Sequence, residues 1–133
     1  MWERKEPSYG DQIRVNRGMY THHGIFISEE SVIHFAPPGN TDVLDPSKAR
    51  VINTSLDEFL KGGVLEVRVY TDEELKRKRS PKAVVAEAVA HLGEGGYNII
   101  SNNCEHFSNL CAFGMKESNQ VEAVFSLLFG GRR

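Results

Sequence analysis

Strand-like and helix-like patterns occupy different halves of this chain of 133 residues, and this separation limits the folds that it can adopt. Apolar and polar residues alternate, or β-branched and aromatic residues gather, in four segments: 11–16, 20–28, 32–36 and 64–70. The longer helical patterns come after them. Strands followed by helices usually form an antiparallel sheet with the helices packed on it. We therefore predict an α+β fold with a small antiparallel sheet.

Capping signals mark the expected helices. Ser80-Pro81 provides an N-cap and a first helical residue, and Gly93 ends that helix. Its predicted apolar stripe consists of Val84, Val85, Ala88, Val89 and Leu92. Three other helices are expected. The first covers 56–60 and is capped by Thr54 or Ser55, the second begins near Asn103, and the third runs over 119–129. Residues 37–49 are polar and are expected to form a loop.

Composition and length exclude several classes of protein. Sixteen Lys and Arg against eighteen Asp and Glu give a net charge of −2, so no nucleic-acid partner is expected. The apolar runs are too short for a membrane span, the first six residues do not resemble a signal peptide, and two cysteines make no disulfide framework. A reducing, cytoplasmic location is expected. We predict a flexible segment over 1–9 and a single domain over 10–133, in which 117–133 form a helix and tail.

The segment Ser101 to Phe107 carries the most informative cysteine. Asn102 is a suitable N-cap and Glu105 lies three residues later, which completes a capping box and places Cys104 in the first helical turn. Free amides and the helix dipole favour a thiolate there, so we expect a lowered thiol pKa. The alternative is that Cys104 is a small buried hydrophobic residue, which is the interpretation we give to Cys111.

Two histidines on a predicted hairpin are the candidate partners of this cysteine. Partners across a hairpin have residue numbers with a constant sum, so the length of the turn near Glu29-Glu30 decides which side chains share a face. An odd turn places His34 on the face of His22, whereas a two-residue turn places it on the other face. His23 points away from His22 in either case.

The remaining histidines have simpler interpretations. His91 lies in the last turn of its predicted helix and is expected to pair with a charge there. His106 is about 200° around the helix from Cys104, so we assign it a structural role. A zinc site is the alternative use of these side chains, but closely spaced ligand pairs of the Cys-x-x-Cys type do not occur, and no metal or other cofactor is expected.

Three motifs, in order, resemble the lecithin:retinol acyltransferase-like family. They are Tyr-Thr-His-His-Gly-Ile-Phe-Ile over 20–27, Val-Ile-His-Phe-Ala-Pro over 32–37, and Asn-Cys-Glu-His-Phe over 103–107. Gly-Asp-Gln-Ile-Arg-Val over 10–15 is similar to the first strand of the family as well. The resemblance extends from about Gly10 to Met115 and implies a permuted papain-like cysteine peptidase fold.

The resemblance also implies catalytic roles. The family's nucleophile falls on Cys104, its general base on His22, the polar group that holds the base on His34, and a tyrosine beside the base on Tyr20. The implied enzyme is a cysteine-dependent acyltransferase or hydrolase that forms an acyl-cysteine thioester, and its acyl donor is expected to be a phospholipid-type ester.

Other features leave alternatives open. The apolar stretch within 121–129 is too short to span a bilayer, and His23 stands where many relatives carry a large aromatic residue. The basic run 76–79 with Lys82 would suit peripheral contact with anionic lipid. The first alternative function is a cysteine peptidase or amidase of the same superfamily. The second is a non-catalytic binding module, and the sequence does not predict an oligomeric state.

Overall fold

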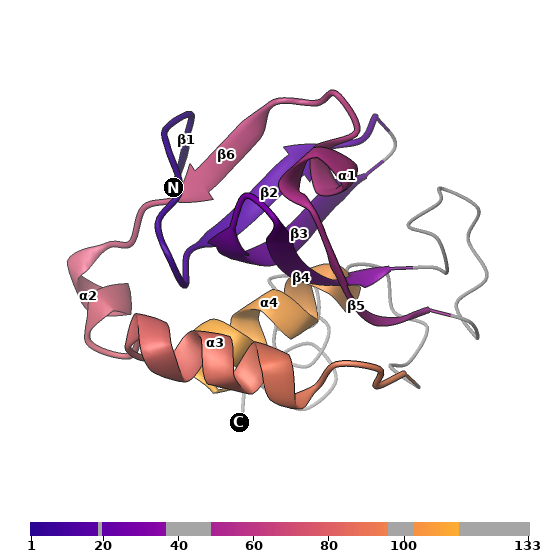
Figure 1. The fold of residues 1–133 in the computed structure, drawn as a ribbon. Helices are drawn as coiled ribbons and strands as arrows, with labels where there is room; N and C mark the ends of the chain where they lie inside the picture. The colour runs from indigo at the N-terminus through magenta and orange to yellow at the C-terminus, as the bar shows by residue number, and fades with distance from the viewer. Residues whose placement is uncertain (19, 37–48, 96–102, 115–133) are drawn as a thin grey trace, which may run out of the picture.

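A six-stranded antiparallel sheet with the order β1-β6-β2-β3-β4-β5 forms the centre of the molecule (Figure 1). The computed structural model describes residues 1–18, 20–36, 49–95 and 103–114. The strands are β1 (Trp2–Glu3), β2 (Gln12–Asn16), β3 (Thr21–Ser28), β4 (Ser31–Ala36), β5 (Arg50–Thr54) and β6 (Leu65–Arg68). The helices are α1 (Leu56–Leu60), α2 (Asp72–Leu75), α3 (Pro81–Ala90) and α4 (Asn103–Phe113).

Helices cover both faces of this sheet. On one face, α3 and α4 pack against apolar side chains of the central strands, with the core residues Ile25, Ile33, Phe35, Val51, Val84, Val85, Ala88, Phe107 and Cys111. On the other face, α1 covers a second core of Ile13, Val15, Phe26, Val32, Phe59 and Val67. The α+β prediction is confirmed, with α3 and α4 lying on the opposite side of the sheet from α1 (Figure 1).

The hairpin of β3 and β4 has the register that places His22 and His34 on one face. Ile25 pairs with Ile33 and Phe26 with Val32, so these partners share the sum that an odd turn predicts. The register shifts between Phe26 and Ser28, and a bulge there adds a residue to β3. Ser28 pairs with Ser31, so the turn itself has two residues, and the expectation that only an odd turn lets His22 and His34 share a face is wrong because the bulge restores the shared face.

The structure corrects two expectations about local order. Residues 1–9 were expected to be flexible, but Trp2 and Glu3 pair with β6, and the Trp2 ring packs edge-on against His23 at a centroid distance of 5.4 Å. Val89 and Leu92 were expected to be buried, but they are 48% and 42% exposed. The buried stripe of α3 ends at Ala88, because only the side of the helix that faces α4 and the sheet is covered.

Besides β1, two short elements were not predicted. β5 lies between the expected loop over 37–49 and the expected helix over 56–60. It extends the sheet by pairing with β4. α2 begins with a capping box between Thr71 and Glu74. Residues 37–48, the N-cap at Asn102 and the expected helix over 119–129 lie outside the described residues.

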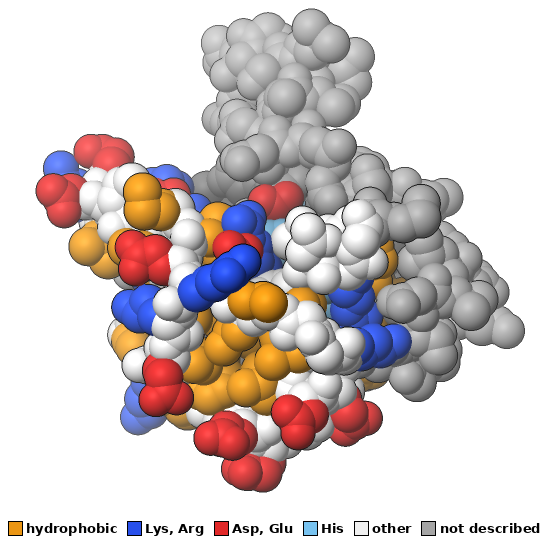
Figure 2. Space-filling view, turned by 90° about the horizontal axis from the view of Figure 1, so that it is seen from above, with side chains coloured by type: hydrophobic (Ala, Val, Ile, Leu, Met, Phe, Trp, Pro, Cys, Tyr) orange, Lys and Arg blue, Asp and Glu red, His pale blue; other side chains and the backbone are white. Residues whose placement is uncertain are grey.

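One side of the molecule carries a partly exposed apolar area between α1 and β6. Val64 is 53% exposed there, and Leu60 and Leu65 are partly buried against the core. Seen from above, hydrophobic side chains gather in the middle of the described surface, with acidic side chains along one rim (Figure 2). Within the described parts of the chain, every helix is too short or too polar to cross a lipid bilayer.

Candidate active site

His22 and His34 form a buried hydrogen-bonded pair. His22 Nε2 lies 2.8 Å from His34 Nδ1, and the two side chains are 2% and 0% exposed. The Phe59 ring packs against both imidazoles, with centroid distances of 5.1 Å to His22 and 5.0 Å to His34. β3, β4 and α1 thus hold the two rings in one arrangement. The expectation that these histidines cooperate is supported by this contact.

Both imidazoles are uncharged at neutral pH. Burial lowers the pKa of His34 from 6.5 to about 3, with a smaller contribution from the positive charges of Arg17 and Lys61. The pKa of His22 is also lowered well below 6.5, first by burial and then by repulsion from His34. A neutral imidazole has one nitrogen with a lone pair, which is what a general base requires.

Cys104 reaches the edge of β3 beside these histidines. Pairing between β3 and β4 begins at Ile25 and Ile33, so Thr21 and His23 precede the paired region. Cys104 Sγ lies 3.7 Å from the carbonyl oxygen of Thr21, and the backbone N–H of His23 faces the sulfur. The N-terminal turn of α4 therefore meets β3 at the residues that flank His22.

The expectation of a lowered thiol pKa at Cys104 is wrong. Burial raises its pKa to about 11. The backbone N–H groups of His23, Glu105 and Cys104 itself lower it, as the helix-terminus argument expected, but desolvation outweighs them because the side chain is 7% exposed. Cys104 is therefore a neutral thiol that contacts the backbone on either side of His22, and His22 Nδ1 has no hydrogen-bond partner among the described residues.

Aromatic contacts lie on both faces of β3, one at His22 and one at His23. The Tyr20 ring lies 6.0 Å from the His22 ring in a T-shaped arrangement, which puts the tyrosine beside the expected base. His23 is buried and contacts Trp2, and the Arg14 guanidinium lies 4.5 Å above the Trp2 ring. His23 therefore fills an aromatic position in the packing, and burial lowers its pKa to about 4.

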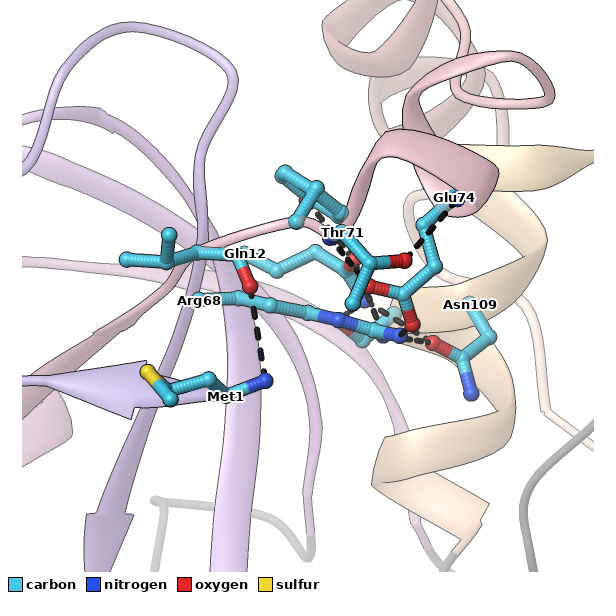
Figure 3. Close-up of polar contacts among 9 residues, drawn as sticks. Met1, Gln12, Arg68, Thr71, Glu74 and Asn109 are labelled. Carbon is cyan, nitrogen blue, oxygen red and sulfur yellow. Dashed lines mark hydrogen bonds and ion pairs between the residues drawn. The ribbon is translucent and has the colours of Figure 1, made fainter.

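A buried polar network, which sequence reasoning missed, fastens α4 to the sheet. Gln12 Nε2 donates to Ser108 Oγ at 2.8 Å and to Asn109 Oδ1 at 2.9 Å. Arg68 donates to Gln12 Oε1, Asn109 Oδ1 and Glu74 Oε2, and its side chain extends between these groups (Figure 3). Ser108 follows Cys104 by one helical turn, so the network sets where α4 presents its cysteine. Gln12 fits the alternation of its strand, which is polar at positions 12, 14 and 16, so the sequence carried no signal that this side chain is buried.

The other candidate residues lie apart from this pair. Cys111 is fully buried in the core, as expected. His91 caps α3 and pairs with Glu87 at 2.7 Å and Glu94 at 2.8 Å, which confirms the predicted charge partnership. His106 is buried in α4. Among the residues described, His, Cys, Asp and Glu side chains form no group of three that could hold a metal ion.

Much of the basic run is engaged with its own neighbours. Lys76 pairs with Glu73 at 3.7 Å, and the Arg77 guanidinium lies 5.2 Å from the Phe113 ring centroid. Lys78 lies 5.2 Å from the ring centroid of Tyr70. Contact of this run with anionic lipid stays a prediction.

The structure thus combines a cysteine in the first turn of α4, whose sulfur contacts the backbone of β3, with a hydrogen-bonded histidine pair on β3 and β4 of an antiparallel sheet, in an α+β protein. The family model described as lecithin retinol acyltransferase matches residues 5–117. The chain therefore belongs to the lecithin retinol acyltransferase family.

Several relatives share this similarity along most of the chain. Phospholipase A and acyltransferase 4 of Homo sapiens is 31% identical over 127 residues, which cover 89% of this chain and 77% of the relative. Phospholipase A and acyltransferase 3 of Mus musculus is 32% identical, covering 87% of this chain and 76% of the relative. Lecithin retinol acyltransferase of Bos taurus is 32% identical over 132 residues, and the match spans 57% of its length.

Proposed function

We propose that this protein is a thiol acyltransferase or hydrolase that takes an acyl chain from a phospholipid-type ester. The lipid class follows from the names of the relatives, which include phospholipase A and acyltransferase. The observation that carries the chemistry is the His22–His34 hydrogen bond of 2.8 Å next to the strand residues that meet Cys104. We assign Cys104 as nucleophile, His22 as general base, and His34 as the residue that holds His22.

In the first step, Cys104 Sγ attacks the acyl carbonyl while its proton passes to the free nitrogen of His22. The proton must leave the sulfur during the attack because the resting thiol and imidazole are both neutral. Burial raises the pKa of Cys104 to about 11 and lowers that of His22. We assign stabilisation of the tetrahedral oxyanion to backbone N–H groups of the first turn of α4, those of Cys104 and Glu105, which lie close to the sulfur.

In the second step, the tetrahedral intermediate collapses, the C–O bond to the leaving alcohol breaks, and protonated His22 donates its proton to that oxygen. The product is the Cys104 thioester and a free lysolipid. His22 then accepts a proton from the incoming amine, alcohol or water, which attacks the thioester and releases the acyl group. We also assign Tyr20, whose ring centroid lies 6.0 Å from that of His22, a role in stabilising the oxyanion.

Capture of the acyl-enzyme tests this function. The protein is incubated with phosphatidylcholine vesicles that carry an isotopically labelled acyl chain, quenched in acid and mapped by peptide mass spectrometry. We expect the label on the peptide that contains Cys104, released by neutral hydroxylamine as a thioester should be. Cys104→Ala should abolish it.

Cys111→Ala is the matched control, because it removes the other thiol of the chain and should leave the label on Cys104. A fluorogenic peptide amide, offered in parallel, distinguishes an ester-lipid enzyme from a peptidase or amidase. If the folded protein shows neither label on Cys104 nor cleavage of the peptide amide, the proposed function is rejected in favour of a binding module.

A further inference from the structure

The hydrogen bond between the two histidines continues to a third side chain, Thr54. His34 Nε2 lies 3.0 Å from Thr54 Oγ1, and Thr54 Oγ1 lies 3.0 Å from the carbonyl oxygen of Ser55. Thr54 is the last residue of β5, opposite Val32 of β4, and Ser55 is the N-cap of α1. A series of hydrogen bonds therefore leads from His22 through His34 and Thr54 to the start of α1.

The direction of each hydrogen bond follows from the Ser55 carbonyl. A carbonyl oxygen only accepts, and a hydroxyl has one proton, so Thr54 Oγ1 donates to Ser55 O. The hydroxyl then offers a lone pair to His34, and His34 Nε2 must carry the hydrogen. A neutral imidazole has only one N–H, so His34 Nδ1 is an acceptor and His22 Nε2 is the donor.

The nitrogen left on His22 is therefore Nδ1 with its lone pair. This atom is buried and has no hydrogen-bond partner within the part of the chain that the structure describes. If Thr54 donated to His34 instead, the direction of each hydrogen bond in the series would reverse. His34 would then carry its hydrogen on Nδ1, and His22 would carry its hydrogen on Nδ1. A protonated Nδ1 on a neutral ring cannot accept the thiol proton of Cys104.

The start of α1 holds this arrangement in place. Ser55 O also accepts the first helical hydrogen bond, from Phe59 N at 3.0 Å, so the carbonyl direction is set by the helix. The Ser55 side chain accepts from Glu58 N at 3.1 Å and completes the capping box. The Phe59 ring packs on both imidazoles and limits their rotation.

We propose that Thr54 is a positioning residue that sets the tautomers of His34 and His22, so that Nδ1 of His22 is the basic nitrogen. The proposal rests on the proposed function in assigning that nitrogen to the proton of Cys104. Thr54 does not touch the reacting atoms and acts through His34.

Two substitutions separate this role from simple packing. Thr54→Val keeps the shape of the side chain and removes the hydroxyl, whereas Thr54→Ser keeps the hydroxyl and loses a methyl group. Nitrogen-15 NMR of histidine-labelled protein at pH 7.5 reads the tautomers without substrate. We expect Nε2–H on both His22 and His34 in the parent protein and in Thr54→Ser, and mixed tautomers in Thr54→Val.

Kinetics on phosphatidylcholine vesicles provide the second measurement. Loss of one buried hydrogen bond predicts a fall in kcat of about 10-fold to 100-fold for Thr54→Val with little change in KM, and Thr54→Ser should restore most of it. A parent protein with Nδ1–H on His22 would overturn the proposal, even if Thr54→Val failed to fold. Parent-like tautomers and kcat in folded Thr54→Val would also overturn it.

The NMR measurement of the histidine tautomers also separates the proposed function from the proposed role of Thr54. If the parent protein transfers no acyl group while its NMR spectrum shows the expected tautomers, the proposed function fails and the role of Thr54 in tautomer selection stands. If acyl transfer occurs at Cys104 with the opposite tautomers, the function stands and the role of Thr54 is rejected.

Discussion

Acid should begin to destabilise this protein at a pH above the range in which carboxylates titrate. His22, His23 and His34 are buried, and each has a pKa lowered below its ordinary value of 6.5, first by desolvation. The unfolded chain therefore binds more protons than the folded protein below pH 6.5. Stability is fully present above that value and falls as the pH decreases toward the folded-state pKa values, about 4 for His23 and about 3 for His34.

The size of the effect follows from these shifts. Between pH 7.5 and pH 5, a histidine whose pKa changes from 6.5 unfolded to about 4 or about 3 folded loses about 2 kcal/mol of stabilisation. His23 and His34 together lose about 4 kcal/mol, and His22 adds to the loss. His91 acts in the opposite direction, because Glu94 and Glu87 raise its pKa. The sum is a large part of the roughly 5–15 kcal/mol that stabilises an ordinary domain.

Urea unfolding followed by far-ultraviolet circular dichroism at pH 7.5 and pH 5 measures this loss. His23→Phe is the informative control, because a phenyl ring can keep the packing on Trp2 and cannot bind a proton. The acid-induced loss should shrink by about 2 kcal/mol in this variant. His91→Gln should make the loss larger.

Two outcomes would refute the reasoning. One is a parent protein that loses less than about 1 kcal/mol between the two pH values. The other is His23→Phe losing as much stability as the parent while it is equally stable at pH 7.5. The first result would mean that the buried histidines titrate near their ordinary pKa, and the second would mean this for His23.

Three further predictions concern single side chains. The rate of iodoacetamide labelling of Cys104 should keep rising from pH 7 to pH 10, because burial raises the pKa of its thiol to about 11. A plateau in that rate below about pH 8.5 would indicate an activated thiolate. Cys111 is fully buried and should stay unlabelled in the native protein. Gln12→Leu should lower the unfolding free energy in urea by about 2–3 kcal/mol, since it leaves buried polar partners unsatisfied, and an unchanged value would show that the network relaxes. Gly24→Ala should cost about 1–3 kcal/mol in the same assay, because its Cβ would lie 2.8 Å from the Phe59 ring, and a neutral effect would mean that the ring moves freely.

Patterns of short range were sufficient to predict most of the described elements. Alternation of apolar and polar residues predicted β2 and β6, and a high content of aromatic and β-branched residues predicted β3 and β4. Caps predicted α1 and α3, because a helix end needs local partners for its free amides. β5 escaped prediction because Val51 is its only buried residue and the strand depends on pairing with β4.

Contacts between distant segments decided the site. The sequence left open whether His22 and His34 share a face, and the bulge in β3 between Phe26 and Ser28 resolved it. Trp2 was expected to be mobile, but its position depends on β6 and on His23, both remote in sequence. Val89 is exposed because a helical stripe is buried only as far as a neighbouring element covers it.

By itself, the sequence determined the class of fold, the helix that begins near Cys104 and the identity of the candidate residues, since these depend on neighbours within a few positions. Only the tertiary structure decided the charge state of the site. The amides at the helix terminus favour a thiolate, but burial between α4 and β3 raises the pKa of Cys104, and burial lowers those of His22 and His34. Desolvation depends on everything packed around a group, which no local pattern records.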